Sequence, residues 1–144
     1  MSQKNKLIVL AVLAALYVGA AYAADDSNST KSMITINSAC FKAASPEKQN
    51  LNGEWVEVAN QGSAAQDLRG WTISTLHNRT YAFKNITLQA GSSVKLHTGI
   101  GNDTATDIYW NKKMPIWNNS GDKATLKDAS GNVLARYPEE SAKS

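Results

Sequence analysis

The sequence of 144 residues predicts an all-β protein in which two antiparallel sheets bury their apolar faces against each other. Three observations lead to this prediction. Short runs alternate between apolar and polar residues with a period of two, which is typical of strands with one wet face. Turn-forming residues such as Gly, Asn and Ser separate these runs. No stretch after the first 23 residues carries the apolar stripe of an amphipathic helix.

Residues 1–23 have the three zones of a secretory signal peptide. Lys4 and Lys6 give a positive start, residues 7–18 are apolar, and residues 21–23 (AYA) match an A-x-A cleavage pattern. We therefore expect a helical signal peptide that is cleaved, and a protein that is secreted or held outside the cytoplasm at the cell surface or in the periplasm. The alternative is an uncleaved leader that anchors the chain to the membrane, because the apolar stretch is near the lower limit for spanning a bilayer.

The rest of the chain divides into three parts. Residues 24–32 and 138–144 are polar and lack an apolar period, so we expect a flexible linker and a disordered tail. Residues 33–137 remain to form one folded domain.

The charge of the chain argues against a strong attraction to nucleic acid. The formal net charge is +3, but removal of Lys4 and Lys6 leaves 13 basic residues against 12 acidic ones. A body so close to neutral has little long-range attraction for a polyphosphate, so nucleic acid is a weakly supported partner.

Seven alternating runs supply the expected strands. They lie at residues 34–36, 56–58, 71–73, 81–83, 94–96, 124–126 and 133–137. Within the last run, Val133, Ala135 and Tyr137 share one face. We expect Trp71, Tyr81, Phe83 and Tyr137 to point inward, because a large ring buries about 150–250 Å².

The one cysteine excludes an intrachain disulfide. Cys40 has the same parity as Ile34 and Ile36, so we expect a small buried thiol. The alternative is an intermolecular disulfide in an oxidising compartment.

Six segments follow the order and spacing of a known family across nearly all of residues 33–137. They lie at residues 53–62 (GEWVEVANQG), 67–73 (DLRGWTI), 81–83 (YAF), 88–91 (LQAG), 117–128 (WNNSGDKATLKD) and 131–133 (GNV). Together they resemble the lamin tail domain family, in the form found in exported prokaryotic proteins. The resemblance implies an immunoglobulin-like β-sandwich with no enzyme chemistry of its own. The chain has no heptad rod and no prenylation motif, and it carries a secretory leader, so we expect no nuclear role.

Residues suited to catalysis or metal binding are sparse. His77 and His97 are the only histidines, and neither C-x-x-C nor H-E-x-x-H occurs. Glu54 and Glu57 have opposite parity, so we expect each to face solvent or pair locally rather than to form a catalytic pair. We therefore expect no catalytic residue, no metal ligand and no cofactor. A calcium site in the loop at residues 99–107 is the alternative to a solvated turn there.

The segment at residues 110–117 is the candidate for ligand contact. Trp110 and Trp117 could stack on sugars or bases, and Lys112 and Lys113 could meet anionic polymers. The alternative is that the tryptophans pack in the core and anchor the loop, which the position of tryptophans in the family favours.

Five N-x-S/T sequons fit an exported and glycosylated surface, where chance predicts roughly two. Their acceptors are Asn28, Asn78, Asn85, Asn102 and Asn118.

The function that follows is an exported, non-catalytic interaction module that docks to a surface polysaccharide or another protein of the cell envelope. We expect contact with a membrane only through an uncleaved leader. Two alternatives remain: a structural envelope subunit that assembles through strand edges, and a small secreted hydrolase or nuclease.

Overall fold

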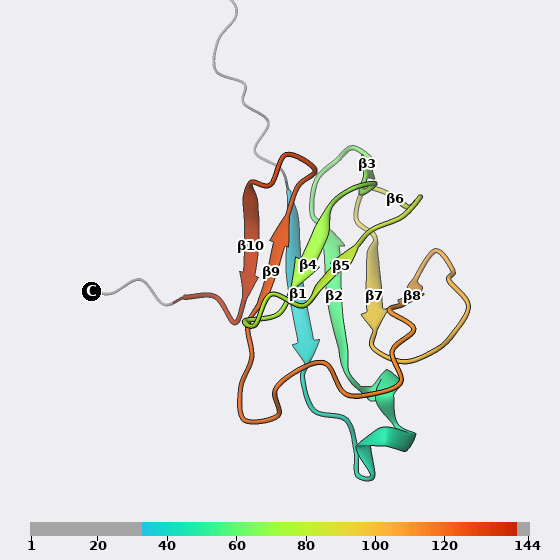
Figure 1. The fold of residues 1–144 in the computed structure, drawn as a ribbon. Coiled ribbons are helices and arrows are strands. Elements are labelled where there is room, and N and C mark those ends of the chain that lie inside the picture. The colour runs from blue at the N-terminus through green and yellow to red at the C-terminus, as the bar shows by residue number, and fades with distance from the viewer. Residues whose placement is uncertain (1–32, 141–144) are drawn as a thin grey trace, which may run out of the picture. The chain divides into compact units, whose positions relative to one another are not determined.

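Short strands joined by turns make up residues 33–140, the part of the chain that the computed structural model describes (Figure 1). The predicted signal peptide at 1–23 and linker at 24–32 lie outside the described residues, as do residues 141–144 of the predicted tail. Two short 3₁₀ helices, η1 (Glu47–Gln49) and η2 (Leu51–Gly53), interrupt the strands. The strands are β1 (Ile34–Cys40), β2 (Trp55–Asn60), β3 (Gln66–Asp67), β4 (Thr72–Ser74), β5 (Thr80–Ala82), β6 (Thr87–Leu88), β7 (Ser93–His97), β8 (Asp107–Tyr109), β9 (Ala124–Lys127) and β10 (Val133–Tyr137).

Two four-stranded sheets form the sandwich, so the predicted all-β, immunoglobulin-like class is confirmed. Their strand orders are β1-β2-β7-β8 and β10-β9-β4-β5, and β3 pairs with β6 in a separate ribbon. One detail differs from the expectation of antiparallel pairing throughout, since β8 runs parallel to β7. The reason is that residues 98–106 carry the chain back along β7 before β8 begins.

The core lies between the two sheets, and β2 shows how the alternation creates it. Val56 and Val58 are fully buried, whereas Trp55 and Glu57 stand half-buried on the outer face. Leu126 and Ile73 meet them from the other sheet within one apolar cluster. The aromatic residues expected to point inward are in or against this cluster: Trp71, Tyr81 and Phe83 are buried and Tyr137 is half-buried.

A β-bulge in β1 corrects the expected burial of Cys40. The register with β2 shifts between Ile36 and Ser38, so one extra residue stands in β1 at this point. Because the side-chain period is two, the shift turns Ala39 and Phe41 toward the core and Cys40 toward the outer face. Cys40 is half-buried there, and its thiol donates a hydrogen bond to the carbonyl oxygen of Lys42.

A second bulge has the same effect in β10. The register with β9 shifts between Val133 and Ala135. Val133, expected to point inward with Ala135 and Tyr137, is exposed, and Leu134 packs against the core in its place.

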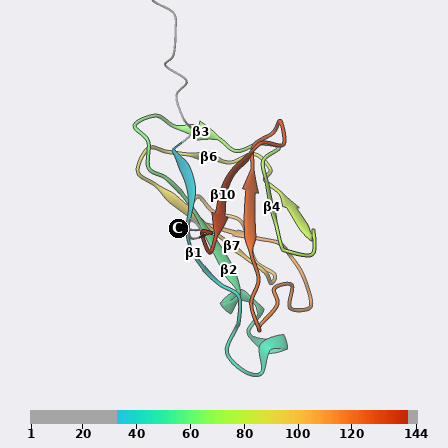
Figure 2. The ribbon, with the colours of Figure 1, turned by 90° about the vertical axis from the view of Figure 1, so that its left-hand side faces the viewer.

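The two ends and two sides of the sandwich differ from each other. The η1 and η2 turns lie at one end, and the β3–β6 ribbon crosses the opposite end (Figures 1 and 2). On one side β1 adjoins β10, as Figure 2 shows, and on the other side β5 and β8 are the terminal strands of their sheets. The loops at the η end place the candidate site.

Candidate functional site

A shallow pocket of about 610 Å³ lies at the η end of the sandwich, between η1, η2 and the loops that follow β7 and β8. We call it the lysine pocket. It is lined by Ala44, Lys48, Gln49, Asn50, Leu51, Asn52, Gly53, Gly99, Ile100, Lys112 and Lys113.

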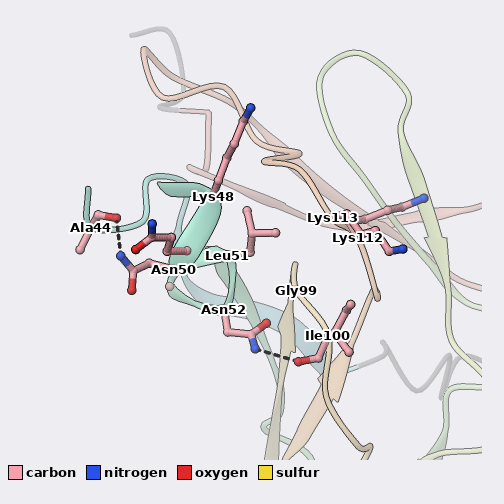
Figure 3. Close-up of a pocket in the computed structure, with 11 residues that line it drawn as sticks. Ala44, Lys48, Asn50, Leu51, Asn52, Gly99, Ile100, Lys112 and Lys113 are labelled. Carbon is pink, nitrogen blue, oxygen red and sulfur yellow. Dashed lines mark hydrogen bonds between the residues drawn. The ribbon is translucent and has the colours of Figure 1, made fainter. Parts of the chain in front are cut away.

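Asparagine side chains hold the wall formed by η1 and η2. The Asn50 amide donates to the carbonyl oxygens of Ala44, at 3.1 Å, and Pro46, at 3.2 Å. The Asn52 amide donates to the carbonyl oxygen of Ile100 at 3.0 Å, as Figure 3 shows. These bonds give fixed positions to turns that are too short to be stable alone.

Backbone hydrogen bonds hold the opposite wall, which carries two of the lysines. The N–H of Trp110 donates to the carbonyl oxygen of His97, that of Asn111 to Gly99, and that of Lys112 to Thr98. Asn111 has a φ of +58°, a left-handed conformation that asparagine tolerates better than most residues. The chain turns there, and Lys112 and Lys113 emerge exposed.

Positive charge gathers around the pocket. Lys48 lies on the η1 side and Lys112 and Lys113 lie on the other side (Figure 3). No carboxylate lines the pocket, and within residues 33–140 none of the three ammonium groups takes part in an ion pair. Glu47, next to Lys48, instead accepts a hydrogen bond from the Asn119 amide at 2.6 Å.

The structure separates the four residues predicted to contact a ligand. Lys112 and Lys113 are at the pocket, whereas the two tryptophan rings pack beneath their loop. Trp117 is 4% exposed, stacks on Phe41 with ring centroids 4.8 Å apart, and meets the edge of Trp110 at 6.1 Å. Trp110 in turn packs against Tyr81 at 5.8 Å. These contacts anchor the loop, and Lys112 and Lys113 are its exposed basic part.

Glu54 follows η2 and was expected at the surface, but it is fully buried. One carboxylate oxygen accepts a hydrogen bond from the backbone N–H of Ile116 at 3.1 Å, which ties the lysine-bearing loop to β2. The other oxygen and the Thr98 hydroxyl are buried without a hydrogen-bond partner in the described residues. Burial raises the pKa of Glu54, and the N–H groups of Ile116 and Trp117 and the nearby Thr98 hydroxyl oppose that shift only in part.

His97 shares the parity of Lys95, which predicts a solvent-facing side chain, but its ring is held between two acceptors and its side chain is 14% exposed. Nδ1 lies 2.9 Å from the carbonyl oxygen of Asn52, and Nε2 lies 2.7 Å from a carboxylate oxygen of Asp107. The ring also stacks on Tyr109. His97 therefore joins η2 in the pocket wall to β8, and its hydrogen bond lowers the pKa of Asp107.

The sequence pattern did not indicate Lys48, Asn50 or Asn52 as residues of the site. Residues 41–53 show no clear period, and nothing local to them indicates that they meet residues 112–113. The signal that could have pointed to them is the density of amide residues in that turn.

The remaining predicted sites lie elsewhere. Asn78, Asn85, Asn102 and Asn118 are all exposed, and Asn28 lies outside the described residues. In the loop considered for calcium, Asp103 accepts from the N–H of Tyr109, and Asp107 is engaged with His97 and Thr106. Among residues 33–140 no group of three or more His, Cys, Asp or Glu side chains is arranged to hold a metal ion.

The W-N-N-x-G-D segment at residues 117–122 forms the turn before β9. Asp122 is 8% exposed and accepts hydrogen bonds from the backbone N–H groups of Leu76 and Asn118, each at 2.8 Å, and of Lys123. Asp122 thus joins this turn to the turn between β4 and β5.

The sequence model of the Lamin Tail Domain family matches residues 27–140.

The chain belongs to the lamin tail domain family. Its fold is accordingly that of an immunoglobulin-like interaction module. No curated protein shows significant similarity to this lamin tail domain chain. Within the described residues, none of the helices has the length and apolar character needed to cross a membrane.

Proposed function

We propose that this lamin tail domain protein is an exported, non-catalytic docking module whose lysine pocket binds an anionic polysaccharide of the cell envelope. The observation that carries the proposal is the presence of Lys48, Lys112 and Lys113 in the lining of one pocket that has no acidic residue. Three unpaired ammonium groups attract and orient a polyanion more strongly than the near-neutral body does.

The lining of the pocket favours a sugar polymer among the anionic partners. Gln49, next to Lys48, makes no side-chain hydrogen bond within residues 33–140 and is exposed, so its amide is free for a sugar hydroxyl. The two tryptophans that could have stacked on sugars or bases pack in or against the core, so the pocket binds through its lysines and through hydrogen bonds. The leader pattern at residues 1–23 supports export to the compartment where envelope polymers occur.

Binding of a defined polyanion tests the proposal. We expect polygalacturonate, a carboxylated polysaccharide, to bind the protein in calorimetric titrations, and neutral dextran not to bind. The paired substitution Lys112→Gln/Lys113→Gln should weaken binding roughly tenfold, or about 1.4 kcal/mol, and flatten its dependence on salt. The matched control Lys84→Gln/Lys127→Gln removes the same charge outside the pocket and should bind as the unmodified protein does. Equal loss in both variants would show that only net charge matters and would refute the pocket.

A further inference from the structure

β5 ends its sheet with an unpaired side. Phe83 donates its N–H to the carbonyl oxygen of Trp71, and Thr75 donates to that of Arg79, so residues 79, 81 and 83 direct their backbone groups toward β4. Alternation then directs the N–H and C=O groups of Thr80 and Ala82 away from the sheet. Within residues 33–140 these four groups have no other backbone or side-chain partner.

The other terminal strands of the two four-stranded sheets are covered. At β8, the N–H of Tyr109 donates to a carboxylate oxygen of Asp103 at 2.9 Å, and the carbonyl oxygen of Asp107 accepts from the N–H of Thr104 at 2.7 Å. The loop before β8 therefore occupies that edge. β1 and β10 lie against each other on the opposite side of the sandwich (Figure 2). Within the two four-stranded sheets of the described part of the chain, β5 is therefore the terminal strand left available for pairing.

A groove of about 440 Å³ lies beside β5, between it and the loop that precedes β8. Tyr81, Ile86, Ala105 and Ile108 give it apolar walls, and Lys84 and Asp103 are at its rim. A strand added to β5 would project every second side chain over this groove, because side chains alternate between the two faces of a sheet.

The charges at β5 select the kind of strand that can be added. Arg79 and Lys84 flank it, both are exposed, and neither forms an ion pair within residues 33–140. Antiparallel pairing of two copies of β5 would bring these like charges together at both ends, which disfavours self-assembly. The same charges attract an extended chain that carries acidic residues at its ends, while Asp103 in the groove lining disfavours acidic side chains over the groove itself.

We propose that β5 is a docking edge that takes an extended segment of a partner protein by strand addition. The partner segment places apolar side chains over the groove and acidic residues beside Arg79 and Lys84. This surface is separate from the lysine pocket, and the proposal stands whether or not the pocket binds a polymer.

A short synthetic peptide tests the docking edge. The probe is Asp-Val-Thr-Val-Thr-Val-Asp, and the reference is the same peptide with Lys at both ends. In hydrogen-exchange NMR of the intact protein, the amides of Thr80 and Ala82 should exchange quickly alone and become protected when the acidic peptide is added. The Lys-ended peptide should bind at least about tenfold more weakly. Unchanged exchange at these two amides, or equal binding of both peptides, would overturn the proposal.

Two variants distinguish strand pairing at the edge from non-specific binding of the peptide. Ala82→Pro removes an outward N–H that the hydrogen bonds between β4 and β5 do not use. The sheet should therefore form, while binding of the peptide should be lost. Ala82→Val keeps that N–H and should bind the peptide. If Ala82→Pro does not fold, Arg79→Glu/Lys84→Glu takes its place and should reverse the preference to the Lys-ended peptide. Protection of Thr80 and Ala82 that rises with protein concentration without peptide would assign the edge to a second copy and reject a partner protein.

Discussion

The buried carboxylate of Glu54 accepts a hydrogen bond at 3.1 Å from the backbone N–H of Ile116, which lies 62 positions further along the chain. This bond joins the start of β2 to the loop that carries Lys112 and Lys113. It also holds a carboxyl group where water does not reach, with one oxygen that lacks a well-formed hydrogen bond near the Thr98 hydroxyl. The buried Glu54 carboxylate therefore weakens the fold when it is ionised.

Glu54→Gln should stabilise the protein at neutral pH. Glutamine keeps an oxygen for the N–H of Ile116, offers an amide donor to the Thr98 hydroxyl and carries no charge. We expect a gain of about 1–2 kcal/mol in the free energy of unfolding, measured by urea denaturation. A loss of stability at neutral pH would show that the ionised carboxylate is required.

The gain from Glu54→Gln should depend on pH with a defined sign. Burial raises the folded-state pKa, so the folded protein binds the proton more tightly than the unfolded chain. The destabilisation by Glu54 is absent below the ordinary carboxyl pKa and develops as the pH rises through the raised value. The difference between variant and unmodified protein should therefore grow from acidic to neutral pH.

Glu57 should show the opposite behaviour. Its carboxylate accepts hydrogen bonds from Asn37 at 2.9 Å, Ser38 at 3.0 Å and Ser93 at 3.1 Å, and its pKa is lowered, first by the bond from Asn37. Its stabilisation is present above the ordinary carboxyl pKa and is lost as the pH falls through the lowered value. Glu57→Gln should cost about 1 kcal/mol at neutral pH and little at acidic pH, in the same urea experiment. A cost that is the same at both pH values would contradict this account.

The contrast between Glu54 and Glu57 shows how far the sequence alone could reach. The alternation of apolar and polar residues correctly predicted that Glu54 and Glu57 lie on opposite faces. It also predicted that Val56 and Val58 point inward, because strand periodicity is a local property. It could not show that the loop at residues 110–117 folds over the end of β2 and buries Glu54. That contact depends on tertiary structure, as does the approach of Lys48 to Lys112. The bulge in β1 could not be predicted for a related reason. The extra residue is defined by the pairing of β1 with β2, and the sequence around Cys40 does not indicate it.

Asp122 should be among the most sensitive polar positions in the fold. Asp122→Ala removes the acceptor for the backbone N–H groups of Leu76, Asn118 and Lys123 and leaves them without a partner. Leu76 and Asn118 lie in different turns. We expect a loss of about 2–4 kcal/mol in the free energy of unfolding. Asp128 accepts from the N–H groups of Ser130 and Asn132 in the next turn but is only half-buried. Asp128→Ala is the matched control and should cost clearly less; equal costs would mean that Asp122 acts only as an ordinary turn residue.

His97 should control both the titration of Asp107 and the rigidity of the pocket wall. The hydrogen bond from His97 is the main cause of the lowered pKa of Asp107. His97→Phe retains a flat ring to stack on Tyr109 but removes both nitrogen contacts. The pKa of Asp107 should then rise toward its ordinary value, as followed by carbon-13 NMR of the carboxyl group.

The same substitution should also loosen η2, because the Asn52 carbonyl oxygen loses the ring nitrogen that lies 2.9 Å away. Amide hydrogen exchange at residues 51–53 should accelerate, while exchange in β9, in the opposite sheet, should stay unchanged. Tyr109→Phe is the control for the stacked ring, since it leaves both nitrogens of His97 in place. An unchanged Asp107 titration in His97→Phe would show that Thr106 alone holds the carboxylate, and unchanged exchange in η2 would mean that Asn50 and Asn52 fix the wall without His97.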